Sequence, residues 1–262
     1  MAQSYSYSKI PSSRIATFDV FSVGLTKHHV AAMLEFDVTD ARKKIREIRR
    51  SGTKVSFNAW IIKAIASTLV QYPEAAAYLK GKRELVIFNS VNISFLVEKN
   101  VNGKKVPLPL LIKSCNTKSL YEITREIEDS VTLATSSSDI VLNKKPTITE
   151  RLYYFLPGFL RRLVWKIMLR NPIFAFGKMG NVSVTSVGMM GQINGWFIHR
   201  AVHPISFGIG SVLKKPMVVD DEIKIREVLN ATILMDHDVI DGAPMVRFIK
   251  DLSTKIERAE EL

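Results

Sequence analysis

One histidine near the C-terminus has the surroundings that proton-transfer chemistry requires. His237 follows an apolar run at residues 231–235 and precedes Asp241-Gly242. Histidine is the side chain whose ordinary pKa suits proton transfer near neutral pH, and a carboxylate four residues later can hold the loop that carries it. The pattern alone is weak, because a histidine after a strand is commonly structural and Asp-Gly is commonly a turn. His237 is therefore a general-base candidate that the rest of the chain must support.

The composition is that of a folded globular protein. The chain has 262 residues, of which 47% are hydrophobic, so it is long enough to bury a substantial core. Cys115 is the only cysteine, which excludes an intrachain disulfide and favours a reducing compartment. Residues 1–13 lack the apolar segment of a secretory signal, and no apolar stretch has the length of a membrane span. These features predict a cytoplasmic protein.

The net charge of +12 is compatible with three classes of partner: nucleic acid, an anionic membrane surface, and a phosphate-bearing small molecule. Nucleic acid is disfavoured, because the basic residues are dispersed and no nucleic-acid-binding motif is present. A basic surface that binds no partner is the plain alternative to all three.

A basic, aromatic-rich segment at residues 143–178 stands apart from the rest. It contains eight basic residues against one acid, Glu150, and Pro157-Gly158 divides it into two short pieces. A basic amphipathic element can lie on a membrane surface or cover an acyl chain. Apolar residues at helical spacing are more often core, which favours packing on the same domain or on a neighbouring subunit.

The hydrophobic pattern predicts alternating helices and strands in one α/β domain with a mixed sheet. Helices are expected over residues 38–50, 55–72, 119–131 and 242–259. Strands are expected over residues 84–88, 91–98, 106–112, 182–187, 205–212 and 228–235, with the first two paired. Caps and turns are predicted at Thr39 or Asp40, at Ser56 or Asn58, and at Asn102-Gly103.

Several collinear segments together resemble the catalytic domain of the dihydrolipoyl acyltransferases of 2-oxo-acid dehydrogenase complexes. The signature of that family is Asp-His-Arg-x-x-Asp-Gly, and residues 236–242 match it except at Asp238. Residues 182–188 resemble the family's strand that ends in Ser-Asn-x-Gly or Ser-Ser-x-Gly, at the family's interval before the histidine. Further matches lie at residues 54–73, 91–94 and 205–219.

The resemblance implies a chloramphenicol acetyltransferase-like two-layer sandwich, an α/β fold in which helices pack on a mixed β-sheet. It divides the chain into an N-terminal extension at residues 1–13 and an acyltransferase-like domain at residues 14–262. A basic amphipathic insertion at about residues 133–179 interrupts that domain.

The resemblance also implies acyl transfer between coenzyme A and a thiol or other small acceptor. In that family the histidine takes the proton of the attacking thiol, and a hydroxyl on the matched strand hydrogen-bonds the oxyanion. Carried over, His237 is the base, Asp241 is the carboxylate that holds its loop, and Thr185 is the hydroxyl donor, with Ser186 as the alternative donor. Arg14 lies near the position of an arginine that pairs with the motif's aspartate. Coenzyme A and acyl-coenzyme A are expected as substrates, with no metal and no covalent lipoyl group on this chain.

Family members form trimers whose active sites lie between subunits. The resemblance therefore implies a homotrimer or a higher assembly built from trimers, with a separate lipoyl protein as a possible partner. The basic segment at residues 143–178 adds peripheral membrane contact as a further possible interaction. Asp238 departs from the signature and adds a carboxylate beside the base, which we expect to favour the protonated imidazole. A non-catalytic trimeric scaffold that has lost turnover is the alternative. The presence of His237, Asp241 and Thr185 favours the enzyme.

Overall fold

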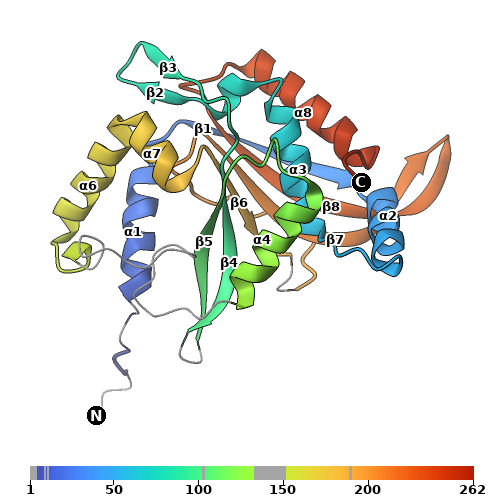
Figure 1. The fold of residues 1–262 in the computed structure, drawn as a ribbon, viewed down its shortest axis with the longest axis horizontal. Helices are drawn as coiled ribbons and strands as arrows, with labels where there is room; N and C mark the ends of the chain where they lie inside the picture. Colours follow the sequence, from blue (N-terminus) through green and yellow to red (C-terminus); the bar gives the residue numbers. More distant parts are fainter. Residues whose placement is uncertain (1–4, 9, 11, 102–103, 133–151, 189–190) are drawn as a thin grey trace.

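A six-stranded mixed sheet forms the centre of the computed structural model (Figure 1), which describes residues 5–8, 10, 12–101, 104–132, 152–188 and 191–262. The strand order is β1-β8-β7-β6-β4-β5, and β6 is parallel to both of its neighbours while the other pairs are antiparallel. This confirms the predicted mixed sheet. The strands are β1 (His29–Asp37), β4 (Ile93–Val101), β5 (Lys104–Ile112), β6 (Val182–Ser186), β7 (Ile205–Val219) and β8 (Glu222–Asp236).

Four helices cover one face of this sheet and complete the predicted two-layer sandwich (Figure 1). Side chains from the two layers meet in the core, where Phe207 of β7 and Phe248 of α8 have ring centroids 6.3 Å apart. Ser56 caps α3 as predicted, because its hydroxyl accepts a hydrogen bond from the Ala59 amide at 3.0 Å. The helices are α2 (Thr39–Arg50), α3 (Phe57–Leu69), α4 (Leu120–Thr132) and α8 (Gly242–Glu257).

One predicted strand pairing is wrong. Residues 84–88 were expected to pair with residues 91–98, but β3 (Glu84–Val86) pairs with β2 (Tyr78–Lys80) in a separate two-stranded sheet, after a short 3₁₀ helix at Pro73–Ala76. The reason is that β4 lies between β5 and β6, so both of its edges are occupied. The predicted turn at Asn102-Gly103 lies outside the described residues.

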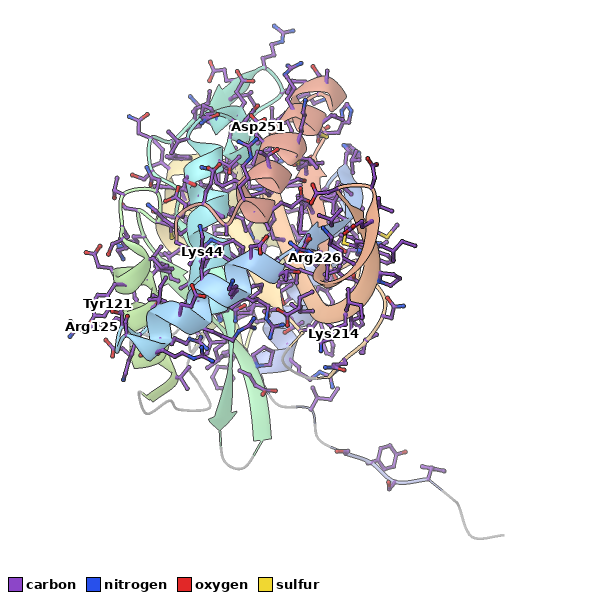
Figure 2. All side chains as sticks on the ribbon, turned by 90° about the vertical axis from the view of Figure 1, so that its right-hand side faces the viewer. Lys44, Tyr121, Arg125, Lys214, Arg226 and Asp251 are labelled. Atoms are coloured by element: carbon purple, nitrogen blue, oxygen red, sulfur yellow. The ribbon has the colours of Figure 1, made fainter. Side chains whose placement is uncertain are left out.

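The hairpin of β7 and β8 is longer than predicted, since the two strands pair as far as Val219 and Glu222. Its tip extends beyond α2 at the edge of the molecule (Figures 1 and 2). In the view of Figure 2, α2 with Lys44 lies between α4, which carries Tyr121 and Arg125, and the hairpin, which carries Lys214 and Arg226. Pro216 is tolerated within β7 because the pairing with β6 ends at Ile209, so that edge of β7 needs no donor there.

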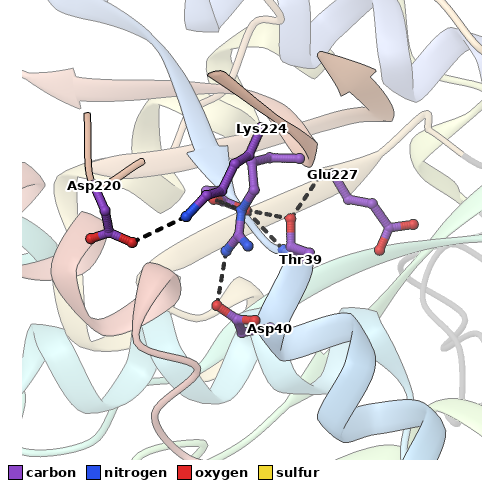
Figure 3. Close-up of polar contacts among 7 residues, drawn as sticks. Thr39, Asp40, Asp220, Lys224 and Glu227 are labelled. Atoms are coloured by element: carbon purple, nitrogen blue, oxygen red, sulfur yellow. Dashed lines mark hydrogen bonds and ion pairs between the residues drawn. The ribbon is translucent and has the colours of Figure 1, made fainter. Parts of the chain in front are cut away.

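Polar contacts join the hairpin to the start of α2 (Figure 3). Arg226 donates to Asp37 Oδ2 at 2.5 Å and to Asp40 Oδ2 at 2.9 Å. Neither Thr39 nor Asp40 caps the helix as predicted, because Val38 occupies the N-cap position and its side chain makes no hydrogen bond. The Asp37 carboxylate accepts from the Thr39 amide at 3.0 Å. The Thr39 hydroxyl instead accepts from the Glu227 amide at 2.8 Å. These contacts fix the far end of β8, the strand that leads to His237.

The basic segment lies beside an N-terminal helix that the sequence did not predict, α1 (Ser12–Gly24). The basic segment includes α6 (Gly158–Arg170) and leads into α7 (Pro172–Met179). Polar groups attach α6 to α1. Asp19, which is buried, accepts from Arg161 Nε and from the Tyr153 hydroxyl, each at 2.6 Å. No residue of α6 is buried. The favoured prediction was packing on the same domain or on a neighbouring subunit. Within this chain, Leu160, Trp165, Met168 and Leu169 of α6 are half-buried, while Phe159, Leu163, Val164 and Ile167 stay exposed.

Candidate active site

His237 lies on a short loop between β8 and α8 that is anchored on both sides. Its amide donates to the His28 carbonyl at 3.0 Å, which extends the pairing of β8 with the start of β1. Val239 and Ile240 are buried, 6% and 5% exposed, whereas His237 and Asp238 are exposed. Because the apolar pair fixes the loop in the core, the imidazole is held outward at the molecular surface.

The carboxylate that holds this loop is Asp236, whose side chain is fully buried. It accepts from Lys27 Nζ at 2.7 Å and from the Asp238 amide at 3.3 Å. The sequence predicted Asp241 for this role. Asp241 is exposed and precedes α8 without making a side-chain cap hydrogen bond.

Arg14, the predicted ion-pair partner, is exposed on α1, and its guanidinium carbon lies 5.9 Å from the Phe18 ring centroid. Within the described part of the chain, the cation beside the loop's buried carboxylate is that of Lys27. Sequence reasoning missed this pair, because Asp236 ends an apolar strand and Lys27 lies 209 positions earlier.

We expect Lys27→Met to destabilise the chain by about 3–5 kcal/mol, because it leaves a fully buried carboxylate without its cation. Urea unfolding at a fixed protein concentration measures the change. Lys224→Met is the matched control, since the partners of Lys224 in the described part of the chain are the exposed Asp220 and Glu222. This substitution should cost less than about 1 kcal/mol. Equal losses in the two variants would contradict a structural role of the Lys27–Asp236 pair.

Asp238 contacts His28 in this structure. The two oxygens of its carboxylate lie 2.9 and 3.0 Å from Nδ1 of His28. This hydrogen bond, and then the charge of Asp238, raise the pKa of His28 above its ordinary value. From the sequence, the Asp238 carboxylate was expected to act on the neighbouring His237. In the structure it is hydrogen-bonded to His28 instead.

Thr185 lies on the face of the sheet opposite the four helices. The register pairs Thr185 of β6 with Gly208 of β7, and Gly208 with Thr232 of β8. Phe207 and Ile209 face the helix-covered core, and side chains alternate along a strand, so the row at Gly208 faces the other way. Ser186, the alternative donor, pairs with Ile209 and is therefore on the core-facing side.

Thr185 contributes to the wall of a small pocket of about 90 Å³. Residues 191–201 cross this face of the sheet, and the Trp196 indole donates to the Leu34 carbonyl at 2.9 Å. Apolar groups dominate the lining, and its one ionisable side chain among the described residues is a histidine. The pocket is formed by Thr185, Val187, Trp196, Phe197, His199, Gly208, Gly210, Asn230 and Thr232.

His199 was not identified from the sequence, although it is central to this pocket. Its Nε2 lies 2.6 Å from the Ser206 hydroxyl. Burial lowers the pKa of His199 to about 4, an effect that the nearby Phe197 carbonyl partly opposes, so the ring is neutral at pH 7. Gly208 makes room for the ring, because a Cβ there would lie 2.8 Å from His199 Nδ1.

The structure does not bring His237 and Thr185 together within one chain. Thr232 lies two strands away from Thr185 in the same row, and His237 follows Thr232 by five residues along β8. Strand spacings of about 4.8 Å and a rise of about 3.3 Å per residue place the two Cα atoms ~19 Å apart. The two side chains together are too short to close that distance.

In the part of the chain that the structure describes, no cluster of three histidine, cysteine or acidic side chains is placed to hold a metal ion. None of the helices described is long and apolar enough to cross a membrane.

Solved structures with the same fold belong to acyltransferases. A probable dihydrolipoamide acetyltransferase from Listeria monocytogenes aligns with a TM-score of 0.71 at 20% identity, covering 98% of this chain and 96% of that one. A chloramphenicol acetyltransferase aligns with a TM-score of 0.51 at 12% identity, over 99% of each chain. These likenesses confirm the predicted fold.

A third structure concerns the dihydrolipoamide acetyltransferase of Azotobacter vinelandii, which aligns with a TM-score of 0.68 at 19% identity over 98% of this chain and 93% of that one. In that enzyme a serine, a histidine 52 positions later and an asparagine four positions after the histidine were investigated for their role in the catalytic mechanism.

The sequence itself matches a family. A curated relative, the dihydrolipoyllysine-residue acetyltransferase component of the pyruvate dehydrogenase complex of Staphylococcus epidermidis, is 29% identical over 225 residues. The match covers 83% of this chain and 43% of that protein, so the chain spans less than half the length of this relative. The family described as 2-oxoacid dehydrogenases acyltransferase (catalytic domain) matches residues 9–139 and 177–262. The chain belongs to this family of acyltransferase catalytic domains.

Proposed function

We propose that this protein transfers an acyl group between coenzyme A and a thiol or other small acceptor, such as the dihydrolipoyl group of a separate protein. The observation that carries the proposal is the placement of Thr185, a hydroxyl-bearing residue, in the wall of an apolar pocket on the face opposite the core. His237 follows it by 52 positions, and Asp241 follows His237 by four. The same two intervals separate the serine, histidine and asparagine of the Azotobacter enzyme, which supports the assignment.

The proposed reaction is thiol exchange on a thioester. His237 takes the proton of the acceptor thiol, and the resulting thiolate attacks the thioester carbon of acyl-coenzyme A. The carbonyl oxygen becomes negative and accepts a hydrogen bond from the Thr185 hydroxyl, which stabilises the tetrahedral intermediate. The bond between carbon and the coenzyme A sulfur then breaks, and the imidazolium returns its proton to that sulfur.

We propose that the complete site forms between copies of this chain, as a homotrimer or a larger assembly of trimers. The distance of ~19 Å within one chain requires a second copy to bring an imidazole to the pocket. The face around the pocket suits such a contact, because it exposes apolar side chains: Met33, Ile193, Trp196, Phe197 and Ile198 are 39–56% exposed. Asp241 and Arg14, both exposed in the single chain, are proposed as contacts within the assembly.

An assay of acyl transfer tests this function against the alternative of an inactive scaffold. The protein is supplied with a series of short-chain acyl-coenzyme A esters and a panel of thiols that includes dihydrolipoamide, and release of free coenzyme A is measured. We expect release that depends on the acceptor. An assembled protein that releases none with any pair would favour the scaffold.

We also propose that α6 contacts an anionic membrane surface. Phe159, Leu163 and Ile167 are 64%, 47% and 58% exposed and recur every four residues, which places them on one side of the helix. Exposed cations at Arg162 and Lys166 lie between them in sequence. The polar attachment through Asp19 holds the opposite side, so the apolar side chains point away from α1. This segment belongs to residues 140–176, which the family does not match and which we propose as an insertion in this chain.

Vesicle flotation tests the contact. We expect the protein to float with phosphatidylcholine vesicles that contain phosphatidylserine, and much less with phosphatidylcholine alone, because the cations must be neutralised at the surface. The double variant Phe159→Ser/Ile167→Ser should reduce flotation at least about fivefold, since it removes apolar area from the membrane-facing side. Ile223→Ser/Ile225→Ser is the control, because these side chains are 79% and 76% exposed on the distant hairpin. Flotation that both double variants reduce equally would contradict a role of α6.

A further inference from the structure

Two polar atoms buried in the pocket beside Thr185 have no hydrogen-bond partner in the described part of the chain. They are Nδ1 of His199 and Oγ1 of Thr232, and Thr232 is only 1% exposed. The Phe197 carbonyl lies near the His199 ring but makes no hydrogen bond of good geometry with Nδ1. Buried polar atoms are nearly always paired in folded proteins, because an unpaired one has lost its water without a replacement. Two such atoms in one pocket therefore indicate a bound group that pairs with them.

The register places these atoms in one row with the proposed oxyanion donor. Thr185, Gly208 and Thr232 are neighbours across three strands, and the two threonine Cα atoms are about 10 Å apart. The His199 ring lies over Gly208, between the two threonines, because glycine has no Cβ to exclude it. A ligand that meets the Thr185 hydroxyl at one end of the row therefore meets His199 and Thr232 further along it.

The chemistry of the pocket selects a neutral polar group. The His199 ring is neutral at pH 7, so its Nδ1 either donates or accepts, depending on which proton Ser206 shares with Nε2. The Thr232 hydroxyl does both. No lysine, arginine or carboxylate contributes to the lining, so a charged group would lack a counter-charge there. A hydroxyl or a keto oxygen fits these partners.

We propose that the pocket holds a short acyl group that carries a hydroxyl or keto oxygen two or three carbons from the thioester carbon. This proposal rests on the proposed function, which places the thioester oxygen at Thr185. Side chains in register on one face of a sheet are spaced about as their Cα atoms are, so the two hydroxyls are taken as about 10 Å apart. Hydrogen bonds of about 2.8 Å at each end then leave about 4 Å between the two ligand oxygens. The pocket volume of about 90 Å³ admits only a short chain.

Two ligands that differ by one oxygen test the proposal: 3-hydroxybutyryl-coenzyme A and butyryl-coenzyme A. Their binding is measured by calorimetry on the assembled His237→Ala protein, which removes turnover, and their kcat/KM values are measured on the wild type. We expect the hydroxylated ester to be preferred about tenfold, the effect of a hydrogen bond of about 1.4 kcal/mol.

Thr232→Val removes Oγ1 at nearly constant volume and should bring the preference close to one. Thr68→Val is the matched control, because Thr68 is equally buried but donates its hydroxyl to the Ala64 carbonyl at 2.8 Å, away from the pocket. We expect that variant to keep the tenfold preference.

The outcomes separate this proposal from the reaction it rests on. Equal affinities for the two esters, with acyl transfer from butyryl-coenzyme A, overturn the polar subsite and leave the acyltransferase. A preference in binding without release of coenzyme A from any ester supports the subsite and overturns the reaction. Equal losses for both esters in Thr232→Val assign the two atoms to the coenzyme A portion and overturn the subsite. A protein that binds neither ester overturns both.

Discussion

Replacing His237 with alanine is expected to lower kcat for acyl transfer by about 10²–10⁴-fold, the usual contribution of a general base. The thiol acceptor would then have to lose its proton to water before attack. The fold should be unaffected, because His237 is exposed and contributes its backbone amide, not its ring, to the loop. Release of coenzyme A measures the rate.

Imidazole added to the His237→Ala protein distinguishes a missing base from a disturbed loop. A free base can enter the space left by the side chain, so we expect it to restore part of the rate. The melting temperature and the mass of the assembly should match those of the wild type. Thiol-dependent release that His237→Ala leaves untouched would contradict the mechanism.

A mixture of two inactive variants is expected to recover activity if, as proposed, the base and the oxyanion donor come from different copies. Thr185→Val alone should lower kcat by about 10²–10³-fold through loss of the hydrogen bond to the oxyanion. When His237→Ala and Thr185→Val chains are co-assembled in equal amounts, random pairing gives about a quarter of the sites both groups. The rate measured after unfolding and joint refolding should therefore approach about a quarter of that of the wild type.

The control is a mixture of wild type with the double variant Thr185→Val/His237→Ala. If each site is shared between two copies, about a quarter of the sites are intact, whereas a site within one chain would leave about half. A mixture of single variants that stays inactive while this control keeps half of the rate would show that one chain supplies both groups. That result would contradict the composite site.

Much of the fold was accessible from the sequence, because hydrophobic periodicity records which side chains are buried. The apolar runs at residues 182–187 and 228–235 predicted strands, and the structure has β6 and β8 there. The outer part of the β7–β8 hairpin was missed, since residues 213–227 alternate charged and apolar side chains around Pro216 without a buried face. Helix α1 was missed as well. Its charged residue Asp19 is buried through contacts with Tyr153 and Arg161, which lie more than 130 positions later.

The choice between Thr185 and Ser186 illustrates what register adds. A shift of one residue along a strand exchanges its two faces, and both residues offer a hydroxyl. The interval before His237 favoured Thr185. The pairing of β6 with β7 then placed Thr185 on the pocket face and Ser186 opposite Ile209 on the core side. Whether Thr185 faces the pocket therefore depends on how β6, β7 and β8 are aligned with one another.

The sequence by itself determined the class of fold and the family resemblance, and it supplied the proposed pair His237 and Thr185, because strand patterns and the interval between two short motifs are local properties of a chain. Only the tertiary structure decided what surrounds that pair. It placed the two residues ~19 Å apart, buried Asp236 against Lys27, and brought His199 over Gly208 beside Thr232. These contacts join residues far apart in sequence or on different strands. Each depends on strand order, register and burial, which a pattern of residue types does not contain.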